Sequence, residues 1–346
     1  MTPRWTRRPD GSNWGEFGAD DELGRINLLT SEKVRQGVAE VRDGRVFCLS
    51  LPLDLPGGNK LNPRRHPPRR FATIREGRQN FNYAFRDDNP DNTDIVCDDA
   101  VLMYTQYSTQ WDSFAHVGAL FDADGDGTAE IVFYNGWRGG EHIVSAAERG
   151  AGEPWARYEG VEARRLGIEN MAVAGVQGRG VLIDLHAHFG RERRLIGYGD
   201  LMRVCEADKV VIERGDMVCL HTGFGDVILE MKGDPDERTL HGSCAALDGR
   251  DDRLLQWITD SGLVILASDN YAVEGLPARK GSGVHAAMPL HEHCLFKLGV
   301  HLGELWYLGE LARYLRHANR SRFLLTAPPL RLPRVVGSPT TPIATV

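Results

Sequence analysis

The sequence predicts one mixed α/β or α+β domain preceded by an N-terminal arm. Stretches typical of β-strands outnumber helical ones along the 346 residues, and the two kinds alternate irregularly. No internal repeat or low-complexity segment divides the chain. We therefore expect residues 1–44 to form an arm and a helix packed on a main domain over residues 45–346.

The N-terminal region reads as an ordered arm followed by a short helix. Residues 1–30 are polar and interrupted by Trp and Gly. A helix is predicted over residues 31–44, with Ser31 as a suitable cap. Three apolar side chains fall on one face of this helix, namely Val34, Val38 and Val41.

A long surface excursion is predicted after the strand at residues 45–53. Residues 54–95 are rich in Pro, Asn, Arg and Asp, and loops of this length are usually functional or packed on a partner. The segment NPRRHPPRRF, residues 62–71, clusters arginines on an extended loop. Such a cluster suits a carboxylate substrate or a neighbouring subunit, and an ordinary solvated loop is the alternative.

The rest of the chain alternates strands with a few helices. The continuous apolar run at 263–270 is typical of a strand buried on both faces. It follows a helix at 251–262 that carries Leu254, Leu255 and Ile258 at helical spacing and ends at Gly262. Further strands are predicted at 95–107, 130–137, 180–186, 216–224 and 322–330, and further helices at 290–299 and 304–319.

Composition excludes several classes of function. The chain has 41 basic and 48 acidic residues, so its charge does not suggest binding to nucleic acid or to an anionic membrane. The six cysteines include no Cys-x-x-Cys pair, which argues against zinc ribbons and thioredoxin chemistry. The arginines near residue 8 are not followed by an apolar run of signal-peptide length, and no apolar run of about 18 residues occurs in the sequence. We expect a cytoplasmic protein that acts on a small molecule.

The segment TQYSTQWDSFAH, residues 105–116, concentrates polar groups in apolar surroundings. If residues 101–112 form a strand, alternate side chains share a face. Buried polar groups need partners or a ligand, so such a face usually lines a cavity, and an exposed sheet face is the alternative. The side chains on that face would be those of Gln106, Ser108, Gln110 and Asp112, with His116 four residues further on.

This segment resembles the signature of the cyclase family of metal-dependent hydrolases, which includes bacterial kynurenine formamidase and isatin hydrolase. The family signature runs His-x-Gly-Thr-His-x-Asp-x-x-x-His. Thr109, Asp112 and His116 match it, whereas Gln106 and Gln110 stand in place of the two leading histidines. Segments similar to those of the longer family members occur at 14–29, 133–137, 269–277 and 289–306.

The resemblance implies a swivelling β/β/α fold, a homo-oligomer and a metal-dependent hydrolase of small, cyclic or open-chain amides and lactones. It also implies roles for individual residues. Asp112, His291 and Glu304 would bind the metal, together with Gln106 and Gln110 if the amides still act as ligands. His293 is the alternative to His291, and His116 would be the general acid and base. Substrate contacts would come from Trp111, Tyr134 and His221, although aromatic residues such as the first two are more often simply part of the core.

The two glutamines leave the metal chemistry open. A carboxamide oxygen is a weaker donor to zinc than imidazole is, so the exchange favours harder cations such as manganese. We expect a divalent ion, manganese or zinc, held mainly by the carboxylates and one histidine. The alternative is a metal-free isomerase or lyase, or a small-molecule binding protein.

A second acidic segment, DADGDGTAE at residues 122–130, resembles the start of a calcium-binding EF-hand loop. The position where such a loop carries a bidentate glutamate is occupied by Phe133. We therefore interpret this segment as a surface turn.

Overall fold

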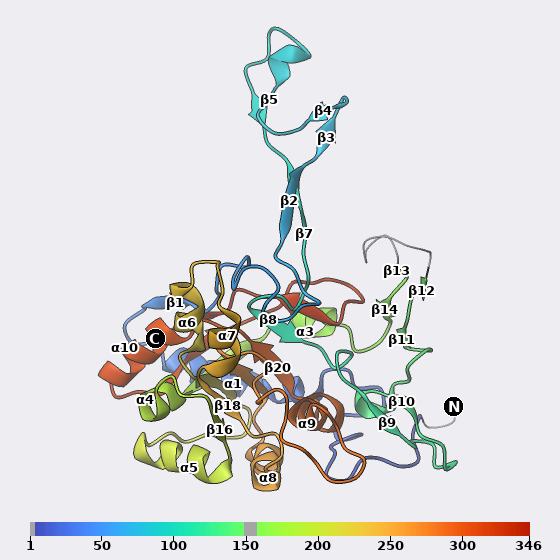
Figure 1. The fold of residues 1–346 in the computed structure, drawn as a ribbon, viewed down its shortest axis with the longest axis vertical. Coiled ribbons are helices and arrows are strands. Elements are labelled where there is room, and N and C mark those ends of the chain that lie inside the picture. Colours follow the sequence, from blue (N-terminus) through green and yellow to red (C-terminus); the bar gives the residue numbers. More distant parts are fainter. Residues whose placement is uncertain (1–3, 149–157) are drawn as a thin grey trace.

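A nine-stranded sheet forms the centre of the computed structural model, which describes residues 4–148 and 158–346 (Figure 1). Residues 1–3 of the predicted arm and residues 149–157 of the predicted main domain lie outside this description. The strand order is β1 (Val46–Cys48), β23 (Ile343–Thr345), β21 (Arg322–Thr326), β15 (Gln177–Asp184), β17 (Met217–His221), β19 (Ile265–Ser268), β20 (His301–Glu304), β8 (Gln110–Asp112) and β22 (Gly337–Pro339).

The four central strands β15, β17, β19 and β20 run parallel to one another, and the strands toward both edges are antiparallel. All residues of β17, β19 and β20 are buried. Parallel strands covered on both faces are expected to be continuously apolar, and this confirms the strand predicted at 263–270.

Helices cover both faces of the sheet. On β15, Val181 and Ile183 enter one core, whereas Leu182 enters the other. The first core also contains apolar side chains of α5 (Tyr198–Ala207) and α8 (Asp252–Ser261). The second contains those of α3 (Glu169–Ala174) and α10 (Gly309–His317). The mixed α+β, single-domain prediction is confirmed.

Helix α8 shows why its prediction succeeded. The Asp251 carboxylate accepts hydrogen bonds from the backbone N–H groups of Arg253 and Leu254, which caps the helix. Gly262 ends it with a left-handed backbone at φ 66°, a conformation that favours glycine.

The N-terminal arm packs on the main domain. The Trp14 indole is fully buried and donates a hydrogen bond to the carbonyl of Phe296. The Arg25 guanidinium donates to the carbonyls of Ile258 and Thr259 in α8. These contacts agree with a packed arm, while the boundary at residue 44 stays a prediction.

Helix α1 (Ser31–Ala39) differs from its prediction in cap and in orientation. Thr30, not Ser31, accepts the capping hydrogen bond. The predicted valine face is wrong, because Val38 is exposed and the helix buries Lys33 and Gly37 instead. A Cβ at Gly37 would lie 2.7 Å from the backbone of strand β15, so the close approach requires glycine there.

The predicted surface excursion is a β-hairpin that projects from the body of the molecule, blue and cyan at the top of Figure 1. Its stem pairs β2 (Arg69–Ala72) with β7 (Asp99–Leu102). Its outer part contains β3 (Ile74–Arg75) with β4 (Arg78–Gln79), β5 (Tyr83–Ala84) with β6 (Ile95–Val96), and η2 (Phe85–Asp87). Several apolar side chains on it are exposed, among them Phe71, Ile74 and Ile95.

Two sequence predictions next to the candidate site are wrong. The strand predicted over 95–107 and on to 112 is interrupted, because β7 ends at Leu102 and β8 begins only at Gln110. The helix predicted at 304–319 begins later, at Gly309, since Glu304 ends strand β20. Pairing of β20 with both β19 and β8 provides the backbone hydrogen bonds that the helix would have provided.

The remaining elements are short. The helices are η1 (Gly24–Leu28), η3 (Tyr134–Gly136), α4 (Leu185–Phe189), α6 (Phe224–Glu230), α7 (Glu237–Gly242), α9 (Pro289–His291) and the π-helical turn η4 (Glu292–Leu298). The two-stranded ladders are β9 (Ala119–Phe121) with β10 (Glu130–Val132), β11 (Ile143–Val144) with β14 (Glu162–Ala163), β12 (Ala147–Glu148) with β13 (Tyr158–Glu159), and β16 (Arg194–Ile196) with β18 (Ala245–Leu247). Over the described ranges, no helix has the length and apolar character needed to cross a membrane.

Candidate functional site

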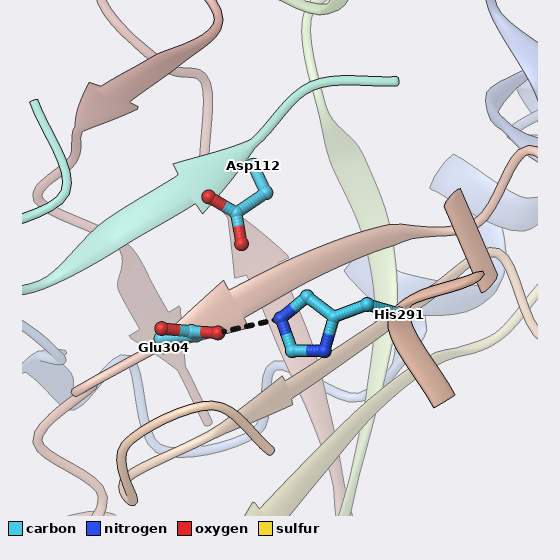
Figure 2. A group of neighbouring side chains, drawn as sticks. All are labelled: Asp112, His291 and Glu304. Atoms are coloured by element: carbon cyan, nitrogen blue, oxygen red, sulfur yellow. Dashed lines mark hydrogen bonds and ion pairs between the residues drawn. The ribbon is translucent and has the colours of Figure 1, made fainter. Parts of the chain in front are cut away.

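Three elements bring Asp112, His291 and Glu304 together. Strands β8 and β20 pair antiparallel, which places Asp112 beside Leu302 and Gln110 beside Glu304. His291 lies where α9 passes into the π-helical turn η4. Figure 2 shows the three side chains pointing toward a common space, and all three are buried.

The geometry of this triad is that of a compact donor set. One candidate ligand atom from each residue lies within 4.8 Å of the other two. His291 Nε2 lies 3.2 Å from Glu304 Oε1, the contact drawn as a dashed line in Figure 2. Glu304 Oε2 accepts a hydrogen bond of 2.9 Å from Gln110 Nε2.

Glu274 holds His291 from the other side. Its Oε1 atom lies 2.8 Å from His291 Nδ1 and accepts a hydrogen bond of 3.0 Å from the backbone N–H of the same residue. Burial acts to lower the pKa of His291, but the hydrogen bonds to Glu274 and Glu304 outweigh it and raise the pKa to about 10. A carboxylate bonded to Nδ1 orients the ring so that Nε2 faces the triad, as in many metal-bound histidines.

Asp112 is the unusual member of the triad. Neither of its carboxylate oxygens has a hydrogen-bond partner among the described residues, although the side chain is fully buried. Burial therefore raises the pKa of Asp112, and the neighbouring charge of Glu304 adds to that effect. Two orphaned oxygens facing an imidazole and a second carboxylate form a donor set that fits a divalent cation.

The two glutamines differ in which side-chain amide atom lacks a hydrogen-bond partner. Gln110 Oε1 is buried without a partner in the described chain, so this oxygen remains available to a cation or a substrate. The unpartnered atom of Gln106 is the amide nitrogen, while its oxygen accepts a hydrogen bond from Thr105. An amide N–H group is a donor and not a metal ligand, so this orientation does not support Gln106 as a ligand.

The other histidines near the triad make different contacts. His116 is partly exposed, with Nε2 3.8 Å from Asp112 Oδ1. His293 points away and contacts the Thr259 hydroxyl at 2.9 Å, so His291 is the one that joins the triad. His301 is buried, and its Nδ1 atom contacts the backbone carbonyl of Asp112 at 2.9 Å.

The residues predicted to contact substrate lie elsewhere. Trp111 is fully buried on the opposite face of β8 from Asp112, where its indole donates to the carbonyl of Ala327. Tyr134 is buried in the other core and bonds to Asp21. The structure thus supports the core alternative for both. His221 is buried as well, and its Nδ1 atom contacts Asp184 Oδ1 at 2.8 Å.

A small cavity beside the triad, with a volume of about 10 Å³ and room for one water molecule, is lined by other residues. Its walls include Asn62, Arg65, Gln106 and Tyr271. The Arg65 guanidinium donates a hydrogen bond of 2.7 Å to the backbone carbonyl of Gln106. The positive charge of Arg65 acts to lower the pKa values of both Asp112 and Glu304. A larger cavity of about 460 Å³ lies between α10 and the end of α5, and no triad residue lines it.

Sequence reasoning missed Glu274, Arg65 and Tyr271 as parts of the site. Glu274 and Tyr271 lie in the segment DNYAVEGLP, whose similarity to the family was the available signal. Arg65 belongs to the arginine cluster, where no local pattern distinguishes it from its neighbours.

The calcium-like loop behaves as a surface turn. The carboxylates of Asp122, Asp124 and Asp126 lie close together, but they accept hydrogen bonds from backbone N–H groups within the loop. Asp122 also pairs with Arg7 at 2.6 Å. These contacts agree with a surface turn.

Comparison with solved structures shows the relationships of the fold. The crystal structure of a novel cyclase is 29% identical, with a TM-score of 0.73 over 97% of each chain. Isatin hydrolase A from Labrenzia aggregata, bound to benzyl benzoate, is 13% identical with a TM-score of 0.52, over 90% of this chain and 98% of that chain. An isatin hydrolase bound to the product analogue thioisatinate is 14% identical with a TM-score of 0.52, over 92% and 99%. At those identities the two hydrolases share the fold with this chain.

Sequence comparison identifies the family. None of the curated proteins matches the chain. The family model named Cyclase matches residues 48–275, which include Asp112, His116, Glu274 and strands β8, β15, β17 and β19 of the central sheet. That match covers more than half of the sequence, and it agrees with the resemblance carried by the segment around Asp112. The chain therefore belongs to the Cyclase family.

Proposed function

We propose that this protein is a metal-dependent hydrolase that acts on the amide or lactone carbonyl of a small molecule, cyclic substrates included. The observation that carries the proposal is Asp112, a fully buried carboxylate whose two oxygens have no hydrogen-bond partner among the described residues. A bare buried charge is costly unless a ligand compensates it. The shared fold with isatin hydrolases adds support.

Asp112, His291 and Glu304 would hold the cation, with Gln110 Oε1 as a further oxygen donor. When bound, a divalent cation supplies Lewis acidity and lowers the pKa of a water molecule. One imidazole with two carboxylates suits zinc, and the extra amide oxygen favours manganese. Gln110 also orients Glu304 through the hydrogen bond from its amide nitrogen.

His116 is the proposed general acid and base. It lies 3.8 Å from Asp112, so it can reach a nucleophile or leaving group next to the triad. Its partial exposure lets it exchange protons with solvent. His116 would remove a proton from the attacking water and return it to the leaving amine or alkoxide. Glu274 would keep His291 Nε2 directed at the triad throughout.

Arg65 and Tyr271, which line the small cavity beside the triad, would contact the substrate carbonyl. Both side chains carry hydrogen-bond donors. These two residues take the place of Trp111 and Tyr134 in the proposal, because both predicted aromatic walls are core residues.

We also propose that the protein is a homo-oligomer in which the projecting hairpin contacts a second copy. A two-stranded ribbon is marginally stable alone, and this one exposes Phe71, Ile74 and Ile95. Light scattering coupled to size-exclusion chromatography should give the mass of at least a dimer. A monomer at micromolar concentration would contradict this.

Elemental analysis tests the metal proposal. Gently purified wild-type protein should contain close to one manganese or zinc ion per triad, and Asp112→Ala should contain none. Asp124→Ala is the matched control, because it removes a carboxylate from the other acidic cluster and should retain the metal. The loaded wild type should hydrolyse members of an amide and lactone panel. Absence of metal after supplementation would overturn the proposal and favour metal-free chemistry or simple binding.

A further inference from the structure

A second cavity lies next to the candidate site. Its volume is about 270 Å³, which is enough for a small organic molecule. Its lining combines apolar side chains with two arginines, a histidine and a serine. The lining residues are Arg64, Arg193, Phe224, Leu240, His241, Ser243, Asn270, Tyr271, Leu276 and Pro277.

The two arginines of this cavity stand out from their neighbours. Arg191 pairs with Glu230 at 2.6 Å, and Arg194 pairs with Asp200 at 3.1 Å. Arg193 lies between these two in sequence, yet neither Arg193 nor Arg64 has a carboxylate partner for its guanidinium anywhere in the described chain. Arg64 and Arg193 are both exposed to solvent, and the protein atoms around Arg193 desolvate its guanidinium in part, which lowers its pKa. Two uncompensated guanidinium groups at one cavity favour an anion.

The cavity is joined to the candidate site through shared and adjacent residues. Tyr271 lines both this cavity and the small cavity beside the triad. The carbonyl of Asn270 accepts a hydrogen bond of 3.0 Å from the backbone N–H of Leu305, the residue after Glu304. Arg193 Nη2 lies 3.7 Å from the position of a Cβ on Gly275, the residue after Glu274.

We propose that this cavity is a carboxylate subsite of the same active site. The substrate would be a small amide or lactone that carries a carboxylate, bound by the guanidinium groups of Arg64 and Arg193. Arg binds carboxylates through paired N–H groups, which gives geometry as well as charge. The apolar body of the substrate would pack on Phe224 and Leu240, while its carbonyl reaches past Tyr271 to the triad. This substrate class rests on the hydrolase function proposed above.

Binding of a simple probe tests the subsite without hydrolysis. Isothermal titration of benzoate and of neutral benzamide should be carried out on chelator-treated protein, so that no metal contributes. We expect wild type to bind benzoate at least tenfold more tightly than benzamide. Arg193→Ala should lose that preference, and Arg193→Lys should retain part of it. Arg191→Ala is the matched control and should bind as wild type does. Equal binding of benzoate by wild type and Arg193→Ala, or no binding by either, would overturn the subsite.

Hydrolysis by the metal-loaded enzyme separates the two proposals. The substrates would be two anilides that differ only by a ring carboxylate. The ratio of their kcat/KM values should favour the carboxylated anilide and fall at least tenfold in Arg193→Ala but not in Arg191→Ala. Hydrolysis with no preference for the carboxylate would overturn the subsite and leave the hydrolase function standing. Benzoate binding that depends on Arg193, in a protein without metal or hydrolysis, would overturn the hydrolase function and leave an anion-binding cavity.

Discussion

Asp112 and Asp216 are both fully buried aspartates at the ends of strands of the central sheet, but the protein surrounds them in opposite ways. Asp216 precedes β17, and its two oxygens accept hydrogen bonds from Lys33, Arg179 and the backbone of Glu213. Asp112 ends β8, and its two oxygens have no hydrogen-bond partner among the described residues.

The difference separates a structural carboxylate from a functional one. Lys33 and Arg179 reach Asp216 from α1 and β15, so this charge joins the arm to the sheet. Asp112 has no comparable cluster of cationic hydrogen-bond donors. Its side chain faces His291 and Glu304 instead. Buried groups without protein partners are where a ligand is expected.

The largest expected effect is the loss of folding stability when Asp216 is substituted. Asp216→Asn would leave Lys33 and Arg179 buried with less compensation, and it should lower the free energy of unfolding by about 3–5 kcal/mol. Asp112→Asn in metal-free protein should cost less than about 1 kcal/mol, because the carboxylate has no hydrogen bond to lose among the described residues. Urea unfolding followed by circular dichroism gives both values. Equal losses would remove the distinction between the two carboxylates.

Metal addition should stabilise the protein only when Asp112 is present. Free manganese at a hundred times its dissociation constant should raise the free energy of unfolding by about 2.7 kcal/mol relative to chelated protein. The gain should vanish in Asp112→Asn, where an amide replaces the carboxylate. An undiminished gain in that variant would place the cation elsewhere, and Asp124→Ala would then show whether it binds the exposed loop.

The next effect is a loss of metal affinity when the hydrogen bond between Glu274 and His291 is removed. Glu274→Gln removes the carboxylate that accepts from His291 Nδ1, and it should weaken metal binding by about 10–100-fold. Glu292→Gln is the matched control, since Glu292 follows His291 at the start of η4 and makes no contact with the imidazole among the described hydrogen bonds. Competition with a fluorescent chelator measures both affinities. Similar losses in the two variants would mean that general charge, not the hydrogen bond, is responsible.

Elements of the fold with local signals were predictable from the sequence. The Asp251 cap, the Gly262 terminator and the continuous apolar run after it define α8 and β19 correctly. The buried face of α1 was not predictable, because it depends on the ion pair of Lys33 with Asp216, 183 residues further along the chain. The break between β7 and β8 carries no glycine or proline to mark it.

The candidate site was predictable only in part. The family resemblance indicated Asp112, His291 and Glu304, and the structure brings these three together. The alternation of a strand already places Trp111 opposite Gln110 and Asp112, so its assignment as a substrate wall conflicted with the strand prediction itself. Glu274 and Arg65 depend on long-range packing, which residue spacing does not reveal.

The smallest expected effect tests what the glutamines do. Gln110→His should raise the affinity for zinc relative to manganese by about tenfold, because a nitrogen donor then faces the triad beside Glu304. Gln106→His should change this ratio much less, since the Gln106 amide lies against Gly337 and presents its nitrogen. Titration of each variant with both metals measures the ratio. A larger change at position 106 would mean that the turn before β8, and not β8 itself, contributes the additional ligand. If neither substitution changes the ratio, both glutamines act on the substrate, and the cation depends on Asp112, His291 and Glu304 alone.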